Sequence, residues 1–230
     1  MTMIIEAKKL VKKFKSGADE LTVLKGLDLS VKQGEFLSIT GRSGSGKSTL
    51  LYQLGLLDRP NTGEININGI DVSSLSDNER TLFHLNELGY IFQDYALVPE
   101  LTAIENVLIP LLMQGLSNQN AEKIAKDAMA KVGLSDKLKN LPSQLSGGEQ
   151  QRISIARAIS HNPKILFADE PTANLDSETA DVVLKTFLAL NKEGQTIVMV
   201  THEPEYAALT DRVLTLQDGI IAREEINLKK

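Results

Sequence analysis

A glycine-rich run at residues 41–48, Gly-Arg-Ser-Gly-Ser-Gly-Lys-Ser, constrains the fold of this chain more than any other feature. A short apolar stretch at residues 35–40 leads into it, and a helical pattern of leucines begins at Lys47. Glycines let backbone N–H groups turn toward phosphate oxygens, and the N-terminus of a helix favours negative charge. Strand, loop and helix in this order predict an α/β core with a phosphate site, and they disfavour a glycine-rich turn without function.

The same run carries side chains suited to a nucleoside triphosphate. The ammonium of Lys47 is placed to neutralise the β- and γ-phosphates, and the hydroxyl of Ser48 is placed to hold Mg²⁺. The predicted nucleotide contacts of the loop are Gly41, Ser43, Gly44, Ser45, Gly46, Lys47, Ser48 and Thr49.

Two acids, Asp169 and Glu170, close a compact apolar stretch at residues 164–168. Because α/β sheets bind ligands at the carboxyl ends of their strands, these acids are expected beside the phosphate loop. Asp169 is predicted to bind Mg²⁺, directly or through water, and Glu170 to accept a proton from the attacking water. Paired carboxylates can also be the N-terminal charges of a helix, but the phosphate loop favours the catalytic interpretation.

A second anion site is predicted at residues 145–150, Leu-Ser-Gly-Gly-Glu-Gln. Ser146 is a helix N-cap, so free N–H groups and the helix dipole converge there, and an ordinary capped helix is the alternative. Two phosphate sites far apart in one chain suggest two copies arranged head to tail around the nucleotide. The predicted contacts of this segment are Ser146, Gly147, Gly148 and Glu149.

The elements that surround these motifs follow from periodicity and turn residues. Residues 94–161 are interpreted as a helical lobe inserted into a core made of residues 1–93 and 162–230, all within one domain. We expect helices beginning at Lys47 and at residues 103–114, 120–132, 146–160 and 177–190. We expect strands at residues 23–31, 35–40, 64–68, 88–92, 164–168, 196–200, 212–216 and 220–224.

Composition excludes several classes of function. The formal net charge of −5 disfavours a nucleic-acid surface, and the lysines at positions 8–15 are expected on a solvated strand edge. Without cysteine there is neither a disulfide framework nor a thiolate metal site. The apolar stretch at residues 107–113 is interrupted by Pro110 and is far shorter than the ~20 residues of a membrane span. The N-terminal apolar run is too short for a signal peptide. We therefore expect a cytoplasmic protein whose membrane part, if it has one, belongs to another chain.

In their order, the motifs resemble those of ATP-binding cassette (ABC) nucleotide-binding subunits over residues 4–226. The matching positions are residues 41–49, Gln93, residues 145–150, residues 165–170, Asn-Leu-Asp at 174–176, and His202. The resemblance implies the ABC ATPase fold, a P-loop NTPase core with an antiparallel β subdomain and an inserted helical lobe. It also implies ATP and Mg²⁺ as cofactors and a homodimer with ATP at the interface, whose two sites sense each other through residues 174–176.

The resemblance adds roles for residues that carry little weight by themselves. Gln93, after the apolar strand 88–92, is expected to reach Mg²⁺ and the lytic water, and His202 to contact the γ-phosphate. Phe14 stands where the family places an aromatic residue that stacks on adenine, with phenylalanine in place of the more usual tyrosine; core packing is the alternative. His84 and His161 have no such support and are expected at the surface.

Two segments are similar to the lipoprotein-releasing and macrolide-export group of ABC ATPases. They are Leu-Asp-Arg-Pro-Asn-Thr-Gly-Glu at residues 57–64 and the stretch from Phe92 to Val107. The similarity implies a permease partner with few membrane spans and a large extracytoplasmic domain, and a location at the inner face of the cell membrane. The ATPase would power export or lipoprotein release; a non-transporting complex that controls cell-wall hydrolases is the alternative.

The segment after Gln93 is expected to link the core to the helical lobe. Its apolar residues are either contacts for the permease or part of the lobe core; they are Leu97, Val98, Pro99 and Leu101. Soluble ABC proteins that act on DNA or ribosomes are disfavoured, because the chain has one cassette and no coiled coil between its phosphate loop and residues 145–150. A degenerate, non-hydrolysing cassette is disfavoured by the complete set of Lys47, Asp169, Glu170 and His202.

Overall fold

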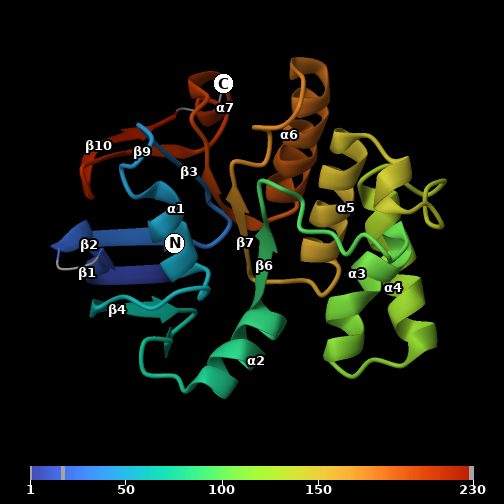
Figure 1. Cartoon of the computed structure of the whole chain (residues 1–230), viewed down its shortest axis with the longest axis horizontal. Helices are drawn as coiled ribbons and strands as arrows, with labels where there is room; N and C mark the ends of the chain where they lie inside the picture. Colours follow the sequence, from blue (N-terminus) through green and yellow to red (C-terminus); the bar gives the residue numbers. More distant parts are fainter. Residues whose placement is uncertain (1, 17–18, 228–230) are drawn as a thin grey trace.

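The computed structural model describes residues 2–16 and 19–227 and contains two sheets and a group of helices (Figure 1). The larger sheet has six strands in the order β10-β9-β3-β8-β7-β6. All neighbouring strands in it are parallel except β10, which runs antiparallel to β9. The strands are β3 (Phe36–Gly41), β6 (Leu88–Ile91), β7 (Ile165–Asp169), β8 (Thr196–Val200), β9 (Arg212–Gln217) and β10 (Ile220–Ile226).

Alternate residues of the central strands enter two different hydrophobic clusters, one on each face of the sheet. In β7, Leu166 and Ala168 face one cluster, and Ile165 and Phe167 face the other. Every residue of β7 and β8 is buried, which explains why these strands appear as continuous apolar runs in the sequence. Helix α1 (Lys47–Leu54) covers one face and α6 (Ser177–Lys192) the other.

The second sheet packs on the α1 side and has the order β2-β1-β4-β5. Its strands are β1 (Met3–Ser16), β2 (Asp19–Lys32), β4 (Thr62–Ile67) and β5 (Ile70–Asp71), all antiparallel. The lysines at positions 8–15 lie on β1, which pairs with both β2 and β4 only up to Val11. Lys8 is therefore not on an edge, whereas Lys13 and Lys15 pair with β2 alone and are exposed, as expected for a solvated strand edge. The left-handed backbone of Lys9 (φ 51°) and nearby register shifts interrupt the alternation of β1, which concealed this strand in the sequence.

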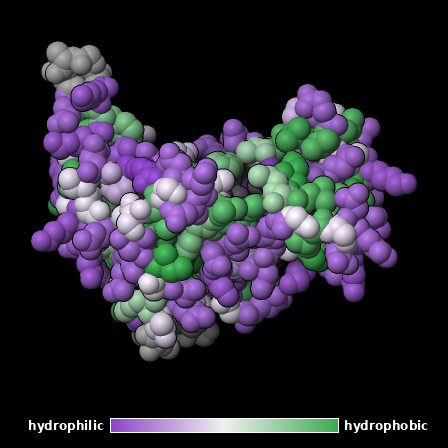
Figure 2. Space-filling model, turned by 90° about the horizontal axis from the view of Figure 1, so that it is seen from below, coloured by the Kyte–Doolittle hydropathy of each residue, from purple (hydrophilic) through white to green (hydrophobic). Residues whose placement is uncertain are grey.

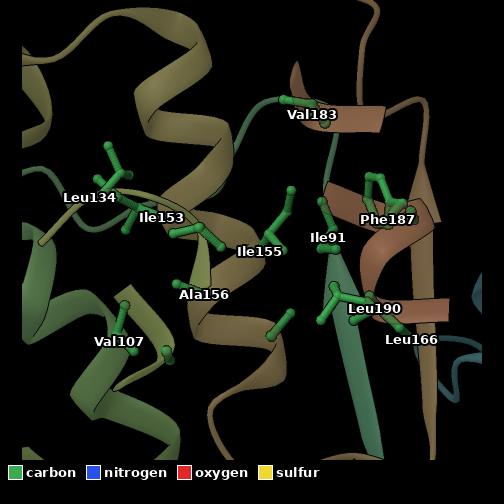
Figure 3. Close-up of a cluster of buried hydrophobic side chains, with 14 of the residues drawn as sticks. Ile91, Val107, Leu134, Ile153, Ile155, Ala156, Leu166, Val183, Phe187 and Leu190 are labelled. Atoms are coloured by element: carbon green, nitrogen blue, oxygen red, sulfur yellow. The ribbon is translucent and has the colours of Figure 1, made fainter. Parts of the chain in front are cut away.

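The helices α3 (Ala103–Met113), α4 (Asn118–Lys131) and α5 (Gly147–Ile159) pack together beside β6 and α6. Figure 3 shows how side chains of α5 such as Ile155 point toward Ile91 of β6 and the α6 residue Phe187. One hydrophobic cluster therefore includes both these helices and one face of the main sheet, so the helical lobe moves against the core only by repacking shared side chains.

Helix α2 (Asp77–Glu87) and the short α7 (Pro204–Ala207) have no counterpart among the predicted elements. Helix α2 begins with a complete capping box, in which Ser76 and Glu79 each accept the other's backbone N–H. This Ser-x-x-Glu pattern is the sequence signal from which the start of α2 could have been predicted. Its helix buries no residue completely, so it lacks the apolar stripe on which periodicity depends. Among the residues that the structure describes, no helix has the length and apolar character needed to cross a membrane.

Candidate nucleotide site

The glycine-rich loop connects the end of β3 to α1, as predicted from its flanking pattern. Two of its glycines cannot carry a side chain in this conformation. A Cβ on Gly41 would lie 2.3 Å from the carbonyl oxygen of Leu216, and Gly46 caps α1 with φ at 101°. These constraints bring the loop backbone close to the N-terminus of α1, where an anion is favoured.

Lys47 holds the loop in its curled form. Its side chain is almost fully buried, and its Nζ donates to the carbonyl oxygens of Gly41 at 3.0 Å and Arg42 at 3.2 Å. The ammonium therefore lies within the ring of the loop, at the place where phosphate oxygens would approach the backbone N–H groups.

Ser48 and Asp169 come together from α1 and the end of β7. The Ser48 hydroxyl donates to Asp169 Oδ1 at 3.0 Å. Burial raises the pKa of the Asp169 carboxyl, and hydrogen bonds from Ser48 and Tyr52 oppose that rise. A hydroxyl and a buried carboxylate are hard oxygen ligands that suit Mg²⁺, and a cation beside them would offset the desolvation of the carboxylate. Sequence reasoning missed Tyr52, whose role appears only when α1 packs against β7.

Glu170 and His202 form the other side of the site. The backbone of Glu170 is left-handed (φ 43°), and its N–H donates to Val200 at 3.0 Å. This turn directs the carboxylate to His202, whose Nδ1 lies 3.2 Å from Glu170 Oε2. Residues from four separate segments thus surround one cleft of about 510 Å³. Its lining residues are Leu21, Val23, Ser43, Gly44, Gly46, Lys47, Ser48, Thr49, Glu170 and His202. Gly41 and Ser45 line an adjoining hollow.

The segment predicted as a second anion site is a fully formed helix N-terminus. Ser146 Oγ accepts the N–H of Glu149, and Glu149 Oε2 accepts the N–H of Ser146 at 2.9 Å. That backbone hydrogen bond lowers the pKa of Glu149. The Glu149 carboxylate therefore already accepts a hydrogen bond within the helix N-cap. Of the described residues that line the cleft, none belongs to 146–149, and α5 lies across the sheet from α1 (Figure 1).

Gly148 is where α5 meets α6 at closest approach. A Cβ on Gly148 would lie 1.9 Å from Cγ2 of Thr179. Gly148→Ala should therefore push the two helices apart and lower the free energy of unfolding by about 1–3 kcal/mol, as overpacking does. Thermal or urea unfolding measures this loss. Thr179→Ser removes the clashing methyl group and keeps the hydroxyl that bonds Asp176, so it should restore stability in the double variant. An additive double variant would contradict the packing explanation.

Two further predicted residues, Gln93 and Phe14, are not among those that line the cleft. The carbonyl of Gln93 accepts from Asn174 Nδ2 at 3.0 Å, which joins it to the loop after β7. Phe14 is 44% exposed and carries Lys12 Nζ 5.1 Å from its ring centre, so the core-packing alternative for it is wrong. It pairs across the sheet with Leu21, which lines the cleft. Neither Leu21 nor Val23 was predicted to line the site. Leu21 lies before the expected strand, and Val23 was expected only as a strand residue.

His84 and His161, expected at the surface, are only partly exposed there. Both are half-buried and line an apolar groove between α2, β6, α3 and α5. His161 Nε2 lies 2.9 Å from the carbonyl of Leu88, and burial lowers the pKa of both imidazoles. In the segment after Gln93, Leu97 packs against the helical core, whereas Val98 and Pro99 are exposed.

Three features together define an ATP-binding cassette. They are a glycine-rich loop at a helix N-terminus, two acids at the end of β7 in the same sheet, and a separate capped helix. Residues 24–173 match the family described as ABC transporter. The chain belongs to the ABC transporter family. It is an ATP-binding subunit that hydrolyses ATP.

Named relatives and solved structures agree with this assignment. The lipoprotein-releasing system ATP-binding protein LolD of Aquifex aeolicus is 50% identical over 202 residues, 88% of this chain and 90% of that protein. The macrolide export ATP-binding/permease protein MacB of Syntrophobacter fumaroxidans is 44% identical over 224 residues, 96% of this chain but 31% of that longer protein. The dimeric ATP-binding cassette MJ0796 bound to ADP and Pi has a TM-score of 0.91 at 39% identity, covering 98% of this chain and 100% of that one.

Proposed function

We propose that two copies of this ATPase close head to tail around two ATP molecules and thereby drive a membrane permease. The observation that carries the proposal is the separation of two anion sites within one chain. The cleft at the phosphate loop contains no residue of 146–149, although that helix N-terminus is capped and open to an anion. A second copy supplies the missing side of each cleft.

The predicted residues take the following roles in this proposal. Lys47 and the loop glycines bind the phosphates, Ser48 and Asp169 would hold Mg²⁺, and Gln93 would join them on closure. Bound Mg²⁺ neutralises charge on the transferring phosphate. Glu170 accepts the proton of the attacking water, and His202, 3.2 Å away, orients the Glu170 carboxylate and faces the γ-phosphate. Ser146, Gly147, Gly148 and Glu149 close the site from the partner.

Adenine is proposed to stack on Phe14. Phe14 is 44% exposed, pairs with the cleft residue Leu21 and belongs to neither hydrophobic core cluster. Phe14→Ala should raise the KM for ATP about two- to tenfold with little change in kcat, because aromatic stacking contributes about 0.5–1.5 kcal/mol. Phe14→Tyr keeps the ring and should behave like the wild type. Steady-state hydrolysis at varied ATP measures both, and an unchanged KM for Phe14→Ala would remove Phe14 from the site.

The proposed contact for the permease is the apolar groove between α2, β6, α3 and α5. The groove has a volume of about 310 Å³ and includes Phe92 and Ala96, on either side of the Gln93 segment. Figure 2, which looks at the lower face of Figure 1, shows hydrophobic side chains gathered between two mostly hydrophilic lobes. Exposed Leu82 of α2 and Met113 of α3 extend the apolar area. A cytoplasmic segment of the permease with apolar side chains fits this surface.

Recovery of the protein from native membranes, followed by identification of its partners by mass spectrometry, tests this proposal. Met113→Glu should reduce recovery of the permease at least about tenfold, since it buries a charge in the apolar contact. Ile220→Glu, at another exposed apolar position, on β10, is the matched control and should recover the permease normally. Recovery without any membrane protein would contradict the proposal. The co-purified proteins distinguish lipoprotein release or export from control of a cell-wall hydrolase.

A further inference from the structure

The loop that follows β6 is held in an unfavourable backbone conformation. Tyr95 and Ala96 are consecutive and both left-handed, with φ at 65° and 49°. The N–H of Ala96 donates to the carbonyl of Asp94 at 2.7 Å, which closes a tight turn only three residues after Gln93. For each residue that carries a Cβ, the equilibrium between left-handed and right-handed backbone lies about tenfold against the left-handed form. Contacts from elsewhere in the protein must therefore maintain the loop.

Arg157, near the C-terminal end of α5, supplies those contacts. Its guanidinium donates to the carbonyl of Ala96 and, at 3.0 Å, to the carbonyl of Tyr95. Burial lowers the pKa of Arg157, and no carboxylate pairs with it among the described residues. Arg157 is half-buried and donates to two carbonyl groups of one strained turn. Because its planar guanidinium holds both oxygens at once, it fixes the shape of that turn.

The same loop also touches the opposite end of α5 and the loop after β7. A Cβ on Gly147 would lie 2.8 Å from the Tyr95 hydroxyl, so this side chain abuts the start of the helix. On the other side, Asn174 donates to the carbonyl of Gln93. The turn at residues 93–96 is thus in contact with both ends of α5 and with the segment that follows Glu170.

We propose that Arg157 is a positioning residue that locks residues 93–96 in their left-handed turn, so that Gln93 and the N-terminus of α5 move as one unit. The inference rests on the proposed ATP-driven closure. The phosphate loop lies elsewhere, so loss of the lock leaves ATP binding intact. Without the lock, closure brings Gln93 to the nucleotide of its own subunit and Ser146 to the nucleotide of the partner independently of each other, and hydrolysis slows.

The test compares Arg157→Gln with Arg152→Gln in the full chain. Arg157→Gln should lower kcat for ATP hydrolysis about tenfold and change the KM for ATP by less than about twofold, as expected when one left-handed residue is no longer held. Arg152 lies on the same helix and bonds Val132, not the loop, so Arg152→Gln should keep wild-type kinetics. Where Arg157→Gln does not fold, Arg157→Lys serves, since it keeps the charge and loses the two-carbonyl fork.

A glycine substitution in the turn shows whether Arg157 acts by holding the left-handed backbone or only by stabilising the protein in general. Glycine adopts a left-handed backbone without steric cost, so Ala96→Gly added to Arg157→Gln should raise kcat at least about threefold. An Arg157 variant with wild-type kcat, or one that Ala96→Gly does not improve, would overturn the inference. Absence of ATP hydrolysis or of ATP-driven dimers in the wild type would instead refute the proposed function, so the two failures are distinct.

Discussion

Glu170→Gln is expected to lower the rate of ATP hydrolysis by a factor of about 10² to 10⁴ without loss of ATP binding. The amide of glutamine cannot accept the proton of the attacking water, yet it can still pair with His202, which lies 3.2 Å from the native carboxylate. The γ-phosphate therefore stays in place. A single-turnover measurement of phosphate release gives the chemical step directly, and the ATP retained on the protein gives the binding.

A matched acid shows whether this loss is specific to the site. Glu205 is exposed on the short helix α7 that follows His202 and lines no part of the cleft, so Glu205→Gln should hydrolyse ATP at the wild-type rate. If Glu170→Gln also turned over ATP normally, Glu170 would not be the general base.

Lys47→Ala is expected to weaken ATP binding strongly and so to remove most turnover at ATP concentrations that saturate the wild type. A charge-assisted hydrogen bond to phosphate contributes about 1.5–3 kcal/mol, so the affinity for ATP should fall about 10- to 150-fold. The loop loses support as well, because Lys47 Nζ bonds the carbonyls of Gly41 and Arg42. Calorimetric titration with ATP measures the affinity.

Lys185→Ala removes an exposed lysine from α6 and serves as the control, with expected wild-type affinity. Normal ATP affinity in Lys47→Ala would show that the loop binds phosphate through its backbone alone.

The sequence was most informative where local pattern and burial coincide. The strands β7 and β8 are short and almost entirely apolar, so their positions, and the acids at the end of β7, could be predicted. Strand β1 could not, because its lysines and the break at Lys9 hide the alternation. Helix α2 was signalled only by its capping box.

The contacts within the site depend on packing that no local pattern records. Tyr52 reaches Asp169 only because α1 lies against β7, and Leu21 lines the cleft only because β2 extends beyond the expected strand. Arg157 and Ala96 are 61 positions apart, and their contact appears only in the folded protein. Motifs therefore predicted the reacting groups, and the three-dimensional structure adds the residues that contact them.

A mixing experiment tests most directly whether each ATP lies between two subunits. Lys47→Ala removes the phosphate loop lysine, and Ser146→Arg blocks the helix N-terminus of α5; both are combined with Glu170→Gln to trap bound ATP. In a mixed dimer, the intact loop of one subunit meets the intact Ser146 of the other, so one complete site remains. We expect mixed dimers to trap one ATP each, while neither variant alone forms an ATP-bound dimer. If the mixture traps no ATP, or Ser146→Arg alone forms ATP-bound dimers, the site is not shared between subunits and the account is wrong.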